Sequence, residues 1–441
     1  MILEGAGRSC PGVPLNSRAV FGPILFLAVL VASCGGGPAA VGTTVPRTPT
    51  DRNLTLVDQM VIDIAEVRQL DAPLDLKISV VSRAELPKLL AGIITDQDRE
   101  QLAETTTLYR LLGHFEDDQD YLEILLSFGS TGVLGLYSPF DDEMWVVSDA
   151  GTEALDDLTR VERETLAHEL VHAIQDFHFP LDESFDELAD DLDASLAFTA
   201  LVEGDATAHE EIYSERFLHG AWGGRLFFVA RPSQAPRDVP LSFIREMLFP
   251  YTTGAGWVRE LLDRYGVDLI NQYLEDFPSS TALVLHPGLI DDGFVPAEMD
   301  LPDLAATLGP GWVRESGGTF GEFQLRNYIQ LGLTGSRAAQ AAAGWTGDHY
   351  DVYASRSESG AAFVIRFSTH SEADQFVEEH ASMLDGRAGG DVIWLGDVDV
   401  YETGSRRFTV ISEADGTDVS FAIGTSEKIA LDIFEGIDGL P

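Results

Sequence analysis

Two histidines four residues apart, with a glutamate directly after the first, form the pattern in this chain that is best suited to chemistry. Residues 168–172 are His-Glu-Leu-Val-His. On an α-helix, positions i and i+4 share a face, so both imidazoles can bind one metal ion while the glutamate activates a water molecule there. Zinc, one ion per chain, is expected because it takes nitrogen and oxygen ligands and leaves one position open in catalytic sites. The spacing predicts His168 and His172 as ligands and Glu169 as general base.

The segment around this pattern has the features of one continuous helix. Between Asp156 and Phe177 there is no Gly or Pro, and apolar residues recur at helical spacing. Acidic side chains at its start suit the positive end of the helix dipole, and Pro180 closes the segment. We therefore expect the three functional side chains to lie on a single, partly buried helix.

A third protein ligand is needed, and Glu203 is the leading candidate. It lies in a second segment with helical spacing, from about Asp193 to Arg216. Small and apolar residues surround it, which is typical of a helix face that packs closely on another helix. A carboxylate in such a place is costly unless it is paired or bound to a metal.

Other side chains compete with Glu203 for this role. His178 falls ten residues after the first histidine of the pattern, as in the HExxHxxGxxH signature of the metzincins. That signature has Gly where this chain has Gln175, and an unbroken helix would turn His178 away from the other two histidines. His209 and Glu210, on the second helix, are further alternatives.

Hydrolysis of an amide also needs a group that stabilises negative charge on the carbonyl oxygen, usually a Tyr or a His. Tyr251 and His286 are candidates, because both stand beside turn-forming residues where loops can face a cleft. A structural role remains the alternative for each.

Around these residues the chain resembles a known class of enzymes. The stretches 166–179 (Leu-Ala-His-Glu-Leu-Val-His-Ala-Ile-Gln-Asp-Phe-His-Phe) and 200–206 (Ala-Leu-Val-Glu-Gly-Asp-Ala) are similar to the gluzincin metallopeptidases, the broad thermolysin-like class. More narrowly, they resemble a little-characterised group of bacterial exported proteins with zinc-peptidase domains. The resemblance covers roughly residues 55–300 and is specific only around 132–210.

This resemblance implies zinc on His168, His172 and Glu203, with Glu169 as general base, in a zincin-like domain that acts on peptides or proteins. The chain departs from thermolysin in the longer, acidic connection between His172 and Glu203. It also lacks an obvious downstream copy of the transition-state histidine motif, which leaves substrate handling open.

The segment Gly132–Val147, just before the first helix, predicts two short strands around a Pro-Phe-Asp-Asp turn. In zincin-type peptidases a strand at this place pairs with the substrate backbone. An ordinary hairpin within the sheet fits the sequence equally well.

The amino terminus predicts export. Arg8 and Arg18 precede a 14-residue apolar stretch, Ala19–Ala32, which is too short to span a bilayer. The end of this stretch, Val-Ala-Ser-Cys, resembles the lipobox of bacterial lipoproteins, which implies cleavage after residue 33 and a lipid on Cys34. A plain signal peptide and an uncleaved anchor are the alternatives. Residues 34–53, rich in Gly, Pro and Thr, look like a flexible linker between the membrane surface and the folded part.

The chain is strongly acidic, with 73 acidic against 28 basic side chains and a net charge of −45. Nucleic acid is excluded as a partner, because binding phosphates needs clustered Lys and Arg. The densest acidic run, Asp182–Asp193, offers oxygen ligands for a structural Ca²⁺. It lacks the ligand–Gly–Glu pattern of a calcium loop, however, and we favour a solvated start of a helix.

The rest of the chain divides into two folded parts, both α+β. Residues 54–317 mix helical and strand patterns, as expected of a zincin-like catalytic domain. Residues 318–441 predict a smaller α+β sandwich with helices on one face and no ligand spacing or nucleophile motif.

The patterns together predict a membrane-anchored, extracytoplasmic zinc metallopeptidase. A catalytically inactive surface lipoprotein that uses the metal for structure or partner binding is the main alternative. Metal-assisted hydrolysis of a bond other than a peptide bond is a third hypothesis, because the pattern fixes the metal chemistry better than the substrate.

Overall fold

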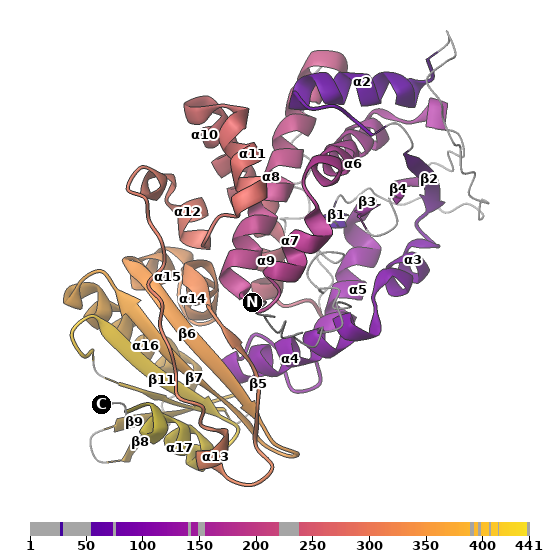
Figure 1. The fold of residues 1–441 in the computed structure, drawn as a ribbon. Helices are drawn as coiled ribbons and strands as arrows, with labels where there is room; N and C mark the ends of the chain where they lie inside the picture. Colours follow the sequence, from indigo (N-terminus) through magenta and orange to yellow (C-terminus); the bar gives the residue numbers. More distant parts are fainter. Residues whose placement is uncertain are drawn as a thin grey trace, which may run out of the picture.

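Helices and two β-sheets make up the protein, which confirms the expected α+β class (Figure 1). The predicted signal segment 1–33 and the predicted linker 34–53, with Cys34, lie outside the described residues except for a short strand, β1 (Leu27–Val29). Within the described part, no helix is both long and apolar enough to cross a membrane. The computed structural model describes residues 27–29, 54–73, 76–139, 143–148, 155–219, 238–388, 392–395, 398–404, 407–412 and 414–438.

The first sheet has four strands in the order β1-β3-β4-β2. Strands β3 (Val133–Ser138) and β4 (Glu143–Ser148) pair antiparallel, so the two strands predicted within 132–147 are confirmed. Strand β2 (Lys77–Ser82) runs parallel to β4, and β1 runs antiparallel to β3 on the other side. Every side chain of β3 is buried, because the strand is covered on both faces.

Helices surround this sheet and form most of the first unit. Two of them carry the pattern residues: α6 (Arg160–His178) and α8 (Leu192–Phe217), which pack against each other. Figure 1 shows α2 lying across their ends. The other elements are α2 (Leu56–Arg68), α3 (Leu86–Ile93), α4 (Asp96–Leu112), α5 (Tyr121–Gly132), η1 (Leu155–Asp157), α7 (Leu181–Glu187), α9 (Leu241–Phe249), η3 (Pro250–Gly254), α10 (Ala255–Tyr265), α11 (Val267–Asp276), α12 (Thr281–Leu285) and η4 (Pro287–Ile290).

The second sheet is antiparallel throughout, with seven strands in the order β5-β6-β7-β11-β10-β9-β8. The strands at residues 392–403, β8 and β9, pair with each other. The strands are β5 (Val313–Gly318), β6 (Trp345–Ala354), β7 (Ser359–Phe367), β8 (Val392–Leu395), β9 (Val398–Thr403), β10 (Arg407–Ile411) and β11 (Asp418–Gly424). The helices of this unit are α13 (Ala305–Leu308), α14 (Gly321–Ile329), α15 (Gly335–Ala341), α16 (His370–Ala388) and α17 (Glu427–Asp438).

Helices cover both faces of this sheet, whereas the sequence predicted helices on one face only. In β7, Phe363 belongs to the apolar cluster under α16, while its neighbour Ala362 packs on the opposite side with Ile433 of α17. Successive side chains of a strand point to opposite faces, so a run that is apolar at every position must be covered twice. The C-terminal helix α17, which the sequence analysis missed, provides the second cover.

The predicted division between residues 317 and 318 falls inside β5, which pairs with β6 along its length. Leu304, further upstream, already packs in the cluster that contains α17. The second unit therefore begins earlier in the sequence than the predicted boundary. The two units meet along α4, whose buried residues Leu108 and Leu112 share a core with β7 and α16.

Candidate metal centre

Two long helices position the pattern residues, and the sequence explains where each begins. Thr159 caps α6: its side chain accepts a hydrogen bond from the backbone N–H of Glu162, and Glu162 in turn accepts one from the backbone of Thr159. Asp191 caps α8 in a similar way, through the backbone N–H of Ala194. The predicted helices over 156–177 and 193–216 correspond to α6 and α8.

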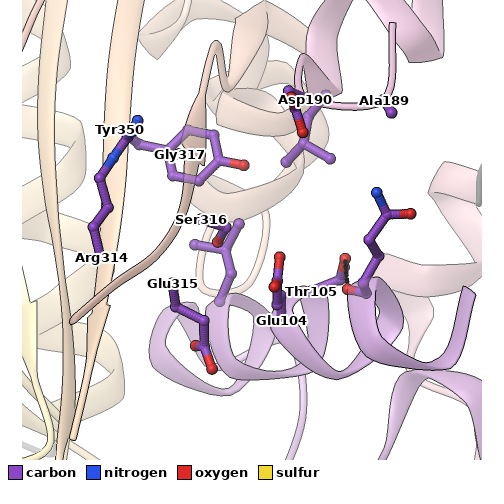
Figure 2. Close-up of a pocket in the computed structure, with 12 residues that line it drawn as sticks. Glu104, Thr105, Ala189, Asp190, Arg314, Glu315, Ser316, Gly317 and Tyr350 are labelled. Atoms are coloured by element: carbon purple, nitrogen blue, oxygen red, sulfur yellow. Dashed lines mark hydrogen bonds between the residues drawn. The ribbon is translucent and has the colours of Figure 1, made fainter. Parts of the chain in front are cut away.

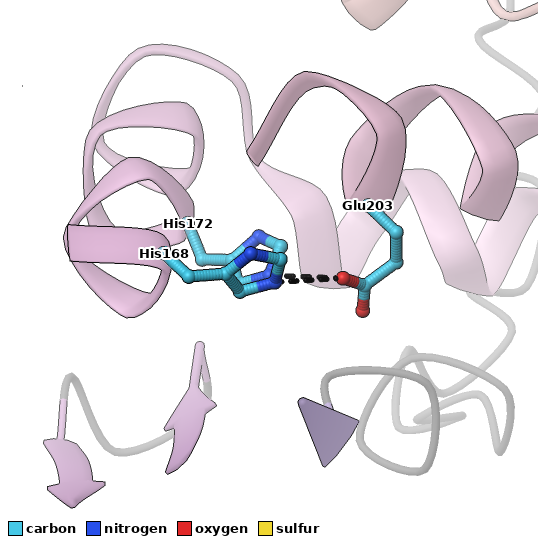
Figure 3. Close-up of side chains that lie close together, drawn as sticks. All are labelled: His168, His172 and Glu203. Carbon is cyan, nitrogen blue, oxygen red and sulfur yellow. Dashed lines mark hydrogen bonds and ion pairs between the residues drawn. The ribbon is translucent and has the colours of Figure 1, made fainter. Parts of the chain in front are cut away.

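The structure brings His168, His172 and Glu203 together in the contact between α6 and α8 (Figure 3). The Oε2 atom of Glu203 lies 3.0 Å from Nε2 of His168 and 3.3 Å from Nε2 of His172. The two imidazole rings are 4.7 Å apart, at an angle of 84°. All three side chains are at least 97% buried, so their polar atoms face one another rather than solvent.

Glu169 is fully buried beside this cluster. Neither of its carboxylate oxygens accepts a hydrogen bond of regular geometry, although the backbone of Tyr137 on β3 lies close. Space for it comes from Gly135 on β3, where an added Cβ would be only 2.5 Å from Oε1 of Glu169. Burial raises the pKa of Glu169 well above its ordinary value, because the charged form loses its hydration.

A chain of buried polar groups holds His172 from behind. Its Nδ1 lies 2.8 Å from Oε1 of Gln175, one turn further along α6. The Gln175 amide donates to the backbone carbonyl of Val202 and to Asp205 on α8. Asp205 also binds the guanidinium of Arg68 from α2, at 2.8 Å, with both side chains fully buried. Partners of this kind fix the orientation of a ligating imidazole.

His168 is held from its other ring nitrogen by Glu210, whose Oε2 lies 3.3 Å from Nδ1. Glu210, one of the alternative ligands, is therefore placed behind the imidazole rather than in front of it. His209, another alternative, binds Asp205 at 2.9 Å. Neither residue belongs to the group of ligand atoms that gathers around Glu203.

Tyr251 is a buried neighbour of the cluster. It lies in η3, a π-helical turn, a type of element found often at functional sites. Its ring stacks on His168 at 6.2 Å, and its hydroxyl interacts with Glu203. The turn can approach α8 closely because Gly204 has no side chain. A Cβ added there would be only 2.7 Å from the carbonyl of Gly254.

The charges within the cluster depend on one another. Burial alone lowers the pKa of His168, but its contacts with Glu203 and Glu210 outweigh this and raise the pKa to about 10. Burial likewise raises the pKa of Glu203, and the two imidazoles outweigh it and bring the pKa down to about 2. When no metal ion is bound, the cluster thus contains a buried ion pair between protonated His168 and ionised Glu203.

This donor set fits a zinc ion. Two imidazole nitrogens and one carboxylate oxygen lie within 4.8 Å of one another, from residues that are all buried. Two His and one Glu are a ligand set of catalytic zinc sites. Three such atoms close together in a buried place require protons or a cation between them.

Two predicted residues lie elsewhere. His286 binds the buried Glu322 of α14 at 3.0 Å and lies beside Arg326, with 43% of its own side chain exposed, so it pairs with residues of the second unit. The Nε2–H group of His178 donates to the backbone carbonyl of Asp71 at the exposed end of α6, and His178 is not a ligand in this arrangement.

The acidic run 182–193 forms most of α7 and the start of α8. This agrees with the helix start that the sequence favoured over a calcium site. Its members have separate partners: Asp191 caps α8, and Asp193 binds Thr281. Across the described parts of the chain, only His168, His172 and Glu203 form a group of three ligand atoms close enough for one metal ion.

The sequence analysis missed Gln175, Asp205, Arg68 and Gly135. Gln175 was noted only as the residue that breaks the metzincin signature. A signal for Asp205 did exist, because it lies two residues after Glu203 in an otherwise apolar helix, where a carboxylate needs a partner. No local pattern pointed to Arg68 or Gly135, which reach the site only through the fold.

Comparison with known proteins gives one match. Residues 311–433 match a family described as a domain of unknown function, DUF8575, which corresponds to most of the second unit. No curated protein and no solved structure matches the chain.

Proposed function

We propose that the protein is a zinc-dependent metallopeptidase in which His168, His172 and Glu203 hold the metal and Glu169 is the general base. The observation that carries the proposal is the meeting of these three ligands between α6 and α8, with the Glu169 carboxylate buried beside them and lacking a regular hydrogen bond. The neighbouring mixed sheet, with β3 packed on α6, supports a zincin-like fold for the first unit.

Each residue has a defined task in this proposal. Zinc bound there would polarise the scissile carbonyl and lower the pKa of water. Glu169, whose own pKa is raised by burial, takes a proton from the attacking water and delivers it to the leaving amine. Tyr251, beside His168, would donate a hydrogen bond to the developing oxyanion. His286, the other candidate for stabilising the oxyanion, lies in another part of the protein, so we assign this role to Tyr251 alone.

Strand β3 supports a peptide as substrate. It borders the site through Gly135, and its outer edge pairs with residues 27–29 in an antiparallel arrangement. An extended peptide can pair with such an edge in the same way. If the segment 1–33 is a cleaved signal, its removal exposes this edge. The proposal includes a lipid on Cys34 that keeps the protein at an extracytoplasmic membrane surface.

A second candidate function follows from the burial of the cluster. His168, His172 and Glu203 are only 0–2% exposed, and closed metal sites are typical of structural zinc. In this case the protein is a non-enzymatic surface lipoprotein whose metal stabilises the contact between α6 and α8.

One set of variants separates the two functions. Glu169→Gln should keep near-stoichiometric zinc, measured by elemental analysis, while kcat/KM on a peptide library falls by at least about a hundredfold. Glu203→Ala should lose the zinc. Glu275→Gln, an exposed residue of α11, makes the same chemical change far from the site and should alter neither measurement. Full peptidase activity in Glu169→Gln would refute the mechanism, and zinc binding without hydrolysis in the wild type would favour the structural function.

A further inference from the structure

A cavity of about 510 Å³ lies where the two units meet, and it shares no residue with the metal centre (Figure 2). Its walls come from α4, from the connection between α7 and α8, and from β5 and β6. A volume of this size suits a small organic molecule. Because β5 belongs to the family-matched unit and α4 to the first unit, the cavity exists only when both are present.

The lining is acidic. Glu104 from α4, Asp190 before α8 and Glu315 from β5 all face the cavity, and Arg314 is the one basic residue in its lining. The Arg314 guanidinium is already held by Asp351, with 2.5 Å between Nε and Oδ1. The carboxylates of the cavity therefore have no basic partner left within it.

Two further observations indicate that polar groups of the cavity await a ligand. Tyr350 is 96% buried, and its hydroxyl points into the cavity without a hydrogen-bond partner among the described residues (Figure 2). Buried oxygens of Gln101 and Glu315 also lack partners. The two buried oxygens of Gln101 and Glu315 are costly when left unsatisfied, and they and the Tyr350 hydroxyl can all accept hydrogen bonds.

We propose that this cavity binds an organic cation that carries ammonium groups. Three carboxylates supply the opposite charge, and the Tyr350 hydroxyl and the Gln101 amide oxygen accept the N–H groups. A bare metal ion does not fit, because its oxygen ligands would have to lie about 2.3–2.6 Å from it. No three carboxylates here gather within 4.8 Å, as judged over the described residues.

The electrostatics of Glu104 agree with this. Burial, together with the neighbouring carboxylates of Glu315, Glu100 and Asp190, raises the pKa of Glu104 to about 7. A bound ammonium group favours the ionised carboxylate, so affinity should fall as the solution becomes more acidic. Between pH 8 and pH 6 the ionised fraction of Glu104 drops about tenfold, and binding should weaken by a similar factor.

The test is calorimetric titration of the full chain with spermidine at pH 8 and 150 mM salt, which screens exposed charges. One saturable site is expected, weakened at least tenfold in Glu104→Gln and several-fold in Tyr350→Phe. Glu104→Gln removes a repelled charge and should fold at least as well as the wild type. The matched control Glu275→Gln, on the surface of α11, should bind like the wild type.

A second ligand, the methylamide of N-acetyl-lysine, distinguishes a free polyamine from a lysine side chain of a peptide. Binding of either ligand with the same dependence on Glu104 supports the proposal. Equal loss in Glu104→Gln and Glu275→Gln would overturn it, since binding would then reflect only the net charge of the protein. Calcium binding at Glu104 without any binding of the amines would overturn it as well.

Discussion

Replacing Arg68 by methionine should destabilise the protein severely. The guanidinium of Arg68 and the carboxylate of Asp205 are both fully buried, 2.8 Å apart, and a second Arg68 nitrogen donates to Asn271 at 2.7 Å. The pair, with His209 and Gln175, holds the pKa of Asp205 below its ordinary value although burial raises it. Without Arg68 this charge stays buried and mostly uncompensated, which costs about 3–5 kcal/mol. That is a large share of a total stability of about 5–15 kcal/mol.

A matched variant isolates the effect of burial. Arg259 forms an ion pair with Glu211 at the same distance, 2.8 Å, but the two side chains are 40% and 29% exposed. Arg259→Met removes the same atoms and should cost no more than about 1 kcal/mol, because solvent screens exposed pairs. Urea unfolding followed by circular dichroism measures both free energies. The double variant Arg68→Met/Asp205→Asn should recover part of the loss, since the uncompensated charge is then gone.

The same titrations can refute the structure of this network. Equal and small losses in Arg68→Met and Arg259→Met would mean that Asp205 is not buried against Arg68. A large loss in Arg68→Met that Asp205→Asn does not relieve would mean that Arg68 acts through packing rather than charge. Because Asp205 binds Gln175, and Gln175 binds His172, the zinc content of Arg68→Met should fall as well.

Other changes test separate parts of the structure. Gly135→Ala should lower the free energy of unfolding by about 1–3 kcal/mol and displace Glu169. The control Gly92→Ala, at a position of α3 with open space around it, should raise that free energy by up to about 1 kcal/mol. Equal effects of the two variants in urea unfolding would contradict the close packing of β3. Burial raises the pKa of Asp193 to about 7, so the folded state holds a proton that the unfolded state has lost, and stability falls as pH rises from about 4 to 7. Asp193→Asn should reduce this fall by an amount on the order of 4 kcal/mol, and an unchanged pH profile would refute the assignment. A chain without residues 1–33 should lose zinc to a chelator faster than the full chain, because β1 covers the edge of β3; identical rates would contradict this.

The helices that carry the site could be predicted because their signals are local. Thr159 and Glu162 mark the start of α6, and the uninterrupted apolar spacing that follows extends to its end. Glu203 stood out because a carboxylate among small apolar residues needs a partner. Its approach to within 3.3 Å of both imidazoles depends in addition on how α6 and α8 pack against each other, which only the structure shows.

The rest depended on contacts between distant parts of the chain. Tyr251 could be proposed only from its neighbouring turn residues, whereas its place beside His168 results from the contact between Gly204 and Gly254. His286 had an equally favourable local sequence, yet it pairs with Glu322 in the second unit. No spacing rule distinguishes the two, because the choice is made by tertiary packing. The second cover of the C-terminal sheet was missed for the same reason.

The electrostatics of the metal centre are hard to explain without a cation. Burying Glu203 requires a positive charge, and in the absence of metal His168 supplies it by holding a proton up to a pKa of about 10. This solution leaves Glu169 buried with no regular hydrogen bond and Glu210 close behind the same imidazole. The one positive charge, on His168, thus faces the carboxyl groups of both Glu203 and Glu210, while the raised pKa of Glu169 favours its neutral form. A divalent ion held by the imidazoles and Glu203 would supply two charges, and His168 would then be neutral and free to donate from Nδ1 to Glu210. The residues behind the cluster therefore make most sense as the supports of a metal site.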